Sequence, residues 1–394
     1  MVESVAYVLL IGSLFSFLFK KMHLPKLLGM IFAGILIGPY FLNILDTNML
    51  AISSDLRQMA LIIILTRAGL SLDLSDLKKV GRPAILMCFL PACFEMMTTI
   101  FIAPLLFDIS YLDAAILASV IAAVSPAVVV PKMIELMDKK LGTRQAIPQL
   151  ILAGASVDDV FVIVMFSCFT SLASGNGFSF TSLLQVPFSI LNGILIGYLL
   201  GYIISLFFNK VKMDSISSFI FVLSFSFLLM KLEAIIKPFI PFSGYLSIMA
   251  LGLAIHRNCK EESQSLNSIY SKCWMIAQIF LFLLVGASVN IKVAFHAGIN
   301  SILLILFVLL IRIIGVFCCL IKTSLNRKER FFIAISYIPK ATVQAAMGGI
   351  PLAMGFSCGE LILAISVISI LISAPVGAIL MDVFDKICLI QENV

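Results

Sequence analysis

Long apolar stretches, separated by short polar segments, follow one another along the whole chain. A stretch of about 17–25 apolar residues is long enough to cross the hydrocarbon core of a bilayer as a helix. The chain holds thirteen such stretches, at approximately residues 3–19, 26–43, 57–73, 83–107, 112–137, 147–173, 186–208, 215–232, 242–256, 271–290, 297–321, 330–354 and 359–384. This pattern predicts an all-α polytopic membrane protein with thirteen transmembrane helices.

In two of these stretches, the fifth and the twelfth, prolines mark candidate breaks. The fifth has Pro126, directly after Ser125, and Pro131, and the twelfth has Pro339 and Pro351. Proline lacks a backbone N–H and clashes with the preceding helical turn. We therefore expect both to be broken helices whose freed backbone groups are buried in protein or line a water-filled cavity. For the fifth stretch, an ordinary proline kink is the alternative.

The thirteen stretches divide into two sets of six joined by one connecting helix. Because the connecting helix adds one crossing, the second set starts from the opposite side of the membrane, which gives six-plus-six inverted repeats. The two stretches with candidate breaks are then the fifth in each set. Interrupted helices at corresponding positions of two inverted halves indicate a binding site near the bilayer midplane.

Composition and charge agree with this topology. Of 394 residues 61% are hydrophobic and 12% charged, and the mean hydropathy is +1.14, whereas about 25% of residues in soluble domains are charged. Lys and Arg favour cytoplasmic loops, and an external N-terminus places twenty of the 27 in cytoplasmic segments and four outside. We expect an external N-terminus, a cytoplasmic C-terminus and a bacterial-type plasma membrane. The net charge of +6 then reflects topology and not nucleic-acid binding.

Two adjacent carboxylates, Asp158 and Asp159, lie near the middle of the sixth stretch. A charged side chain at this depth costs on the order of 3 kcal/mol, so the pair indicates a functional site. Neighbouring residues on a helix point about 100° apart. One carboxylate can therefore face a water-filled cavity, together with Ser156 three residues before Asp159, while the other faces a buried partner.

Buried cations are available as partners. Glu95 lies at the centre of the fourth stretch and Arg312 near the middle of the eleventh, and a guanidinium suits a buried carboxylate because it stays protonated and bonds in a bidentate way. We expect these two to pair, either to fix the helices or to act directly in transport. Lys340, in the twelfth stretch, is a second deep cation, and either it or Arg312 could hold Asp158 charged.

The chemistry of these residues favours a monovalent cation and a proton. Small hard cations take oxygen ligands, which Asp159, Ser125, Ser156, Thr342 and freed backbone carbonyls can supply. A carboxylate that binds either a cation or a proton, combined with alternating access, is sufficient for exchange. The nine cysteines include no CxxC pair, so neither a disulfide framework nor a resident metal site nor a cofactor is expected.

Two other classes of protein can be weighed against exchange. An intramembrane aspartyl protease also needs two carboxylates, but its dyad must share a proton across about 3 Å, and adjacent residues on one helix diverge. A passive cation channel is disfavoured by the buried cations. Exchange therefore remains the preferred hypothesis.

Four segments carry a resemblance to a known family: MALIIILTRAGLSLD, SPAVVVPKM, GASVDDV and IPKATVQAAMGGIPLA. With them the chain resembles the cation/proton antiporter superfamily of the NhaA/NapA fold, and most closely its NHA branch of sodium/proton antiporters. The resemblance implies exchange of Na⁺ or Li⁺ for H⁺, with K⁺ as an alternative cation. It also implies that the two broken helices cross, that Asp159 is the main ion- and proton-binding carboxylate, and that Asp158 is its neighbour.

The resemblance further implies a homodimer in the bilayer, with a moving core and a scaffold. The corresponding segments are residues 1–82 (scaffold and dimerisation), 83–174 (first half of the core), 175–296 (linker and scaffold) and 297–394 (second half of the core). In NhaA-like members a lysine stands at the place of Arg312. Because arginine does not release a proton in the working range, proton transport by this residue is in doubt, and one-for-one electroneutral exchange is favoured.

Overall fold

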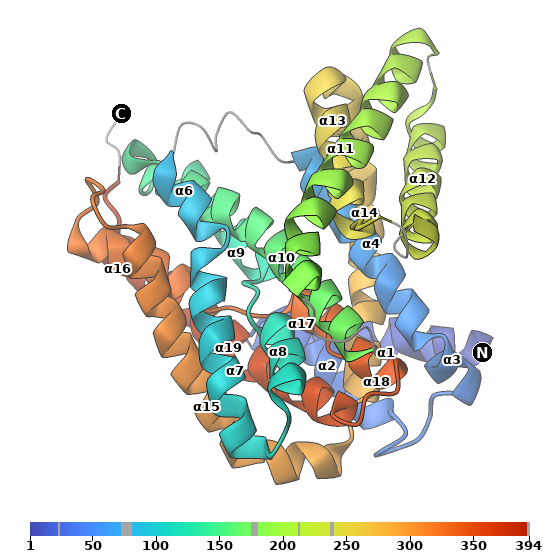
Figure 1. The fold of residues 1–394 in the computed structure, drawn as a ribbon, viewed down its shortest axis with the longest axis vertical. Coiled ribbons are helices and arrows are strands. Elements are labelled where there is room, and N and C mark those ends of the chain that lie inside the picture. Colours follow the sequence, from blue (N-terminus) through green and yellow to red (C-terminus); the bar gives the residue numbers. More distant parts are fainter. Residues whose placement is uncertain (23, 72–80, 175–179, 212, 237–239, 392–394) are drawn as a thin grey trace. The chain divides into compact units, whose positions relative to one another are not determined.

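The computed structural model describes residues 1–22, 24–71, 81–174, 180–211, 213–236 and 240–391, drawn as a ribbon in Figure 1. This described part consists of helices, their connections and one isolated β-bridge between Leu141 and Gln391. In chain order the helices are α1 (Val2–Lys21), α2 (Lys26–Ile37), α3 (Thr47–Ala51), α4 (Ser53–Ser71), α6 (Arg82–Met87), α7 (Leu90–Phe107), α8 (Tyr111–Ile121), α9 (Pro126–Asp138), the 3-10 helix η1 (Thr143–Gln145), α10 (Ile147–Ala173), α11 (Phe180–Lys210), α12 (Ser215–Ile236), α13 (Gly244–Asn258), α14 (Lys260–Ala287), α15 (Ile291–Cys319), α16 (Arg327–Ser336), α17 (Thr342–Met347), α18 (Ile350–Ala353) and α19 (Gly359–Cys388).

Every predicted stretch coincides with one helix or with a run of consecutive shorter helices. Within the described residues, nine helical segments are long and apolar enough to cross a bilayer. The all-α prediction is thus confirmed, whereas the number of thirteen crossings stays a prediction.

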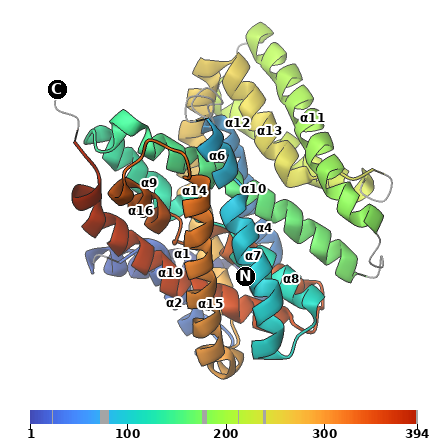
Figure 2. The same ribbon diagram turned by 60° about the vertical axis from the view of Figure 1, so that its left-hand side comes forward.

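The chain forms two compact units: the first comprises Met1–Arg57, Ser75–Val162 and Ile279–Val394, and the second comprises Gln58–Leu74 and Ile163–Gln278. In the first unit α15 packs along α7 and α19, and α19 also contacts α8, α9, α16 and α17. Figures 1 and 2 both show α15 beside α7 and α19. Together, α15 and α19 therefore support the shorter helices of this unit.

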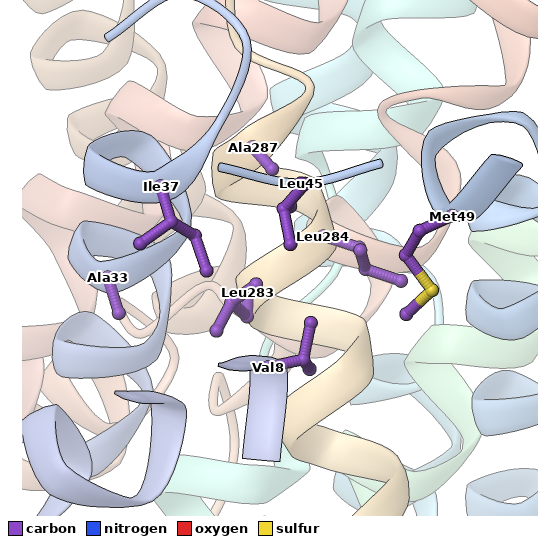
Figure 3. Packing of buried hydrophobic residues seen from close by; sticks show 8 residues of the cluster. All are labelled: Val8, Ala33, Ile37, Leu45, Met49, Leu283, Leu284 and Ala287. Carbon is purple, nitrogen blue, oxygen red and sulfur yellow. The ribbon is translucent and has the colours of Figure 1, made fainter. Parts of the chain in front are cut away.

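Another region of the first unit packs α1, α2 and α3 against the last turns of α14 (Figure 3). Two glycines allow the backbones of α2 and α14 to approach closely: a Cβ on Gly34 would lie 1.9 Å from the Leu283 carbonyl oxygen, and one on Gly286 would lie 2.1 Å from that of Ile31. Small residues commonly mediate such packing between membrane helices. The buried side chains of this cluster are Val8, Ala33, Ile37, Leu45, Met49, Leu283, Leu284 and Ala287.

In the second unit α11 and α12 pack on α13. Gly69 of α4 and Gly252 of α13 again permit close approach, because a Cβ on Gly69 would lie 2.2 Å from the carbonyl oxygen of Met249. The buried polar groups of this unit are uncharged. Every buried Asp, Glu, Lys or Arg within the described part of the chain belongs to the first unit, which is where a site for ions must be sought.

The fifth and the twelfth stretches are both interrupted in their middles. α8 ends at Ile121 and α9 begins at Pro126, while α16 ends at Ser336 and α17 begins at Thr342. Pro126 and Pro351 stand in the first turns of α9 and α18, where the missing N–H would have no helical partner. A proline therefore lies in the first turn of α9 and of α18, whereas α17 begins at Thr342 without one.

Two details differ from the sequence-based interpretation. The assignment of Pro131 to the break is wrong, because α9 continues through it; this proline removes only the bond to the carbonyl four residues earlier. Conversely, the fourth stretch, predicted to be continuous, is interrupted between Met87 and Leu90. The reason is Pro91, which has no N–H to offer the carbonyl of Met87.

Candidate functional site

The two interrupted segments meet at their breaks. The backbone N–H of Ser125 donates to the carbonyl oxygen of Pro339 over 2.8 Å. The side-chain amide of Gln344, on α17, donates to the carbonyl oxygen of Ala123 over 2.9 Å. Irregular backbone is tolerated within a membrane when it is buried in protein. These two hydrogen bonds pair some of the backbone N–H and C=O groups that the breaks leave without helical partners.

Four buried charges form a connected network beside this crossing. Nη1 of Arg312 lies 2.8 Å from Oε2 of Glu95, and Nη2 of Arg312 lies 2.8 Å from Oδ2 of Asp158. Lys340 Nζ lies 2.6 Å from Oε1 of Glu95. All four side chains are at most 1% exposed. Two carboxylates and two cations balance one another, which is the condition under which buried charges are tolerated.

The two cations of this network also donate hydrogen bonds to carbonyl groups at the C-terminal end of α8. Arg312 donates to the carbonyl oxygen of Ala122, and Lys340 donates to that of Ile121. The last carbonyls of a helix lack intrahelical partners and carry partial negative charge. Freed carbonyls were expected to be available to a transported cation, but those of residues 121–123 already accept hydrogen bonds from Lys340, Arg312 and Gln344.

The adjacent carboxylates have different surroundings. Asp158 is fully buried, and its Oδ2 accepts hydrogen bonds from Arg312 and from the N–H of Val124, the latter over 2.9 Å. Of its two possible partners, Arg312 is therefore the one in contact, while Lys340 contacts Glu95. Asp159 is 7% exposed. Its Oδ1 has no hydrogen-bond partner, and among the described residues it forms no ion pair.

Other oxygens near the crossing are also unpaired. Oγ of Ser125 and Oγ1 of Thr342 are buried without a hydrogen-bond partner. Ser125 occupies the N-cap of α9, a position at which serine commonly caps the helix, yet its side chain makes no capping bond. Ser156 lies on α10, but its side chain is outside the described part of the structure. The unpaired set is all oxygen, the ligand type that small hard cations prefer.

Three further residues belong to this region and were not predicted. The carbonyl oxygen of Tyr337 accepts from Nε of Arg312 over 2.9 Å, and Oγ of Ser373 accepts from the N–H of Lys340 over 3.0 Å. Gln344 is the third. The sequence signal for Gln344 was a polar side chain two residues after Thr342 in an otherwise apolar stretch. Neither a serine in an apolar helix nor a backbone carbonyl gives such a signal.

Comparison with known proteins places the chain in a family. Residues 6–382 match the family model "Sodium/hydrogen exchanger, transmembrane". The human sodium/hydrogen exchanger 9B2 is 32% identical over 369 residues, which cover 91% of this chain and 68% of the relative. The mouse sodium/hydrogen exchanger 9B1 is 31% identical over 388 residues, covering 94% and 67%.

The fold is shared with a solved structure. The sodium proton antiporter MjNhaP1 from Methanocaldococcus jannaschii at pH 8 superposes with a TM-score of 0.86 at 21% identity, covering 98% of each chain. The expected antiporter fold and the assignment to the cation/proton antiporter superfamily, with similarity to its NHA branch, are therefore confirmed. The chain belongs to the sodium/hydrogen exchanger family and is an integral membrane protein.

Proposed function

We propose that the protein exchanges Na⁺ for H⁺ by alternating access, and that the two ions compete for Asp159. The observation that carries this proposal is a buried carboxylate, Asp159, that has no counter-charge among the residues the structure describes and follows directly after Asp158 of the balanced four-charge network. Relatives named sodium/hydrogen exchangers support the choice of ions.

Charge counting supports one-for-one exchange. An ionised Asp159 leaves the site with one uncompensated negative charge, which is costly to bury. One proton or one sodium ion removes this charge equally well. Because the site is then neutral in both loaded states, the exchange that we propose is electroneutral. Arg312 and Lys340 balance Glu95 and Asp158 throughout the cycle.

The remaining oxygen ligands are part of the same proposal. Ser125 and Thr342 would coordinate sodium together with Asp159, because their hydroxyl oxygens are unpaired and close to the crossing. Ser156 is included on its spacing from Asp159 along α10. Asp158 would mainly hold Arg312 and the end of α8 in place.

We further propose that α6–α10 and α15–α19 form a moving core, that the other helices form a scaffold, and that two chains associate through it. The distribution of Lys and Arg favours an external N-terminus and a cytoplasmic C-terminus. The relatives named above are mammalian and the solved structure is archaeal, so a bacterial-type plasma membrane draws no support from them. Cross-linking in the membrane would test the dimer.

The proposal is tested by reconstituting the protein in liposomes and following luminal pH while Na⁺, Li⁺ or K⁺ is added. We expect Na⁺ or Li⁺ to release protons at a rate that a membrane-potential clamp does not change. Asp159→Asn should abolish the exchange without altering thermal stability markedly. Asp214→Asn, at an exposed position before α12, is the matched control and should exchange normally.

Each outcome of this assay decides between functions. Proton release only with K⁺ would replace sodium by potassium in the proposal. Exchange retained in Asp159→Asn would contradict the role of this carboxylate. A rate that depends on the clamp would overturn electroneutrality, and no cation-dependent proton flux at all would overturn antiport itself.

A further inference from the structure

Gln344 connects the two interrupted segments through a single side chain. It lies in the first turn of α17 and is fully buried. Its Nε2 donates to the carbonyl oxygens of Ala123, over 2.9 Å, and Ile121, over 3.3 Å, at the end of α8. The amide nitrogen thus ties α17 to the opposite half of the crossing.

The oxygen of this amide, Oε1, accepts no hydrogen bond among the described residues. A side-chain amide has its donors on nitrogen and its acceptor on oxygen. Because Nε2 faces two carbonyl oxygens, turning the amide around would place oxygen against oxygen, so the hydrogen-bond network fixes its orientation. Oε1 is buried and has no hydrogen-bond partner. A buried acceptor that is left unpaired is unfavourable unless something else binds it.

The amide that carries this oxygen is anchored at the break, where three consecutive residues each make a contact. Ala123 contacts Gln344, the N–H of Val124 contacts Asp158, and the N–H of Ser125 contacts the other interrupted segment. The Gln344 amide and the Asp158 carboxylate therefore bind the two ends of the same peptide group, the one between Ala123 and Val124. Buried oxygens without a hydrogen-bond partner occur on Ser125, Thr342 and Gln344 of the crossing segments and on Asp159, the neighbour of Asp158.

We propose that Gln344 is an additional residue of the cation site, whose Oε1 supplies an uncharged oxygen ligand to the transported sodium ion while its nitrogen holds the crossing together. This inference rests on the sodium/proton exchange proposed above. An amide oxygen coordinates a hard cation without adding charge. It therefore increases cation affinity while leaving the balance between one sodium ion and one proton unchanged.

The test is Gln344→Met, which keeps the length of the side chain and removes both polar ends. In the liposome assay we expect the KM for Na⁺ to rise about tenfold, as for the loss of one coordinating group, and the ratio of the Li⁺ and Na⁺ KM values to change. Gln149→Met is the matched control. Gln149 also has an unpaired buried Oε1, but it lies nine residues before Asp158 on α10, about 13 Å along the helix.

A purely structural role would give a different result. The nitrogen's role in joining the helices affects thermal stability without sodium, whereas a ligand role affects the additional stability that sodium confers. We expect Gln344→Met to lose most of this sodium-dependent increment, and Gln149→Met to keep it. An unchanged KM for Na⁺, an unchanged Li⁺/Na⁺ ratio and a normal sodium increment in Gln344→Met would overturn the inference.

If Gln344→Met does not fold, Gln344→Glu decides the matter. A carboxylate among the cation ligands introduces a second group for which protons compete, so the KM for Na⁺ should depend more steeply on pH than in the unmodified protein. An identical pH dependence would overturn the inference. Absence of exchange in the unmodified protein would instead overturn the proposed function, so the two failures are distinguishable.

Discussion

At the scale of single residues, the main contrast is between Asp158 and Asp159. They are neighbours on α10, yet Asp158 is held by Arg312 and by the N–H of Val124 while Asp159 has no ion pair among the described residues. The rotation of about 100° per residue in a helix separates them. One carboxylate is part of the charge network, and the other is the one that we propose binds an ion.

The double mutant of Glu95 and Arg312 tests the charge network. Arg312→Ala leaves two carboxylates, Glu95 and Asp158, facing Lys340 alone, whereas in a Glu95→Ala background it leaves Asp158 and Lys340 in balance. Removing one partner of a buried pair costs about 3–5 kcal/mol. We therefore expect Arg312→Ala to lower the Tm in detergent far more in the unmodified protein than in Glu95→Ala. Additive losses of stability would contradict a shared network.

At the scale of helices, α9, the second helix of the interrupted fifth stretch, is tied to α19. Nζ of Lys132 lies 2.7 Å from Asp382 and 2.9 Å from Asp385. The N–H of Gly142 also donates to the carbonyl oxygen of Ile390 over 3.0 Å. These contacts fix the end of α9 although the helix is not continuous with α8.

Replacing Lys132 measures this connection. Lys132→Met should destabilise the protein by about 2–3 kcal/mol, because it leaves the buried carboxylate of Asp385 without a counter-charge. Lys139→Met is the control: its partner Glu135 is on the same helix and both are exposed, so a loss of about 0.5 kcal/mol or less is expected. Equal Tm losses in the two variants would show that the α9–α19 contact adds little.

Helix packing predicts opposite effects for two glycines. In Gly34→Ala the new methyl group would meet the Leu283 carbonyl of α14, so we expect a lower Tm. At Gly298, inside α15, a Cβ would have no atom within 4 Å, and Ala in place of Gly favours a helix by up to about 1 kcal/mol. Gly298→Ala should therefore be neutral or stabilising, and a loss there would contradict the packing of α15.

At the scale of the whole molecule, the proposed competition between two ions at one carboxylate predicts the pH response. Lowering the pH protonates Asp159, so the KM for Na⁺ should rise by up to about tenfold per pH unit in the acidic range and become constant in the alkaline range. The maximal rate should change less. Initial rates at several sodium concentrations and pH values test this, and a KM independent of pH would contradict shared occupancy of Asp159.

The sequence already determined a large part of this protein. Hydrophobic run lengths predicted the helices. Pro126 and Pro339 located the two interruptions, and the position of Asp159 within an apolar stretch indicated a candidate site. These features are local, because run length, a missing N–H and the cost of a buried charge are properties of the chain segment itself. The four segments that resemble the antiporter superfamily added the fold.

Only the tertiary structure decided the partners. Whether Asp158 binds Arg312 or Lys340, that Gln344 joins the two halves of the crossing, and that the carbonyls at the end of α8 are already engaged all depend on distances between segments that are 150 or more residues apart along the chain. Several pairings satisfy the same charges and depths in a sequence. Packing selects one of them, because in a close-packed interior only one arrangement brings each donor to its acceptor.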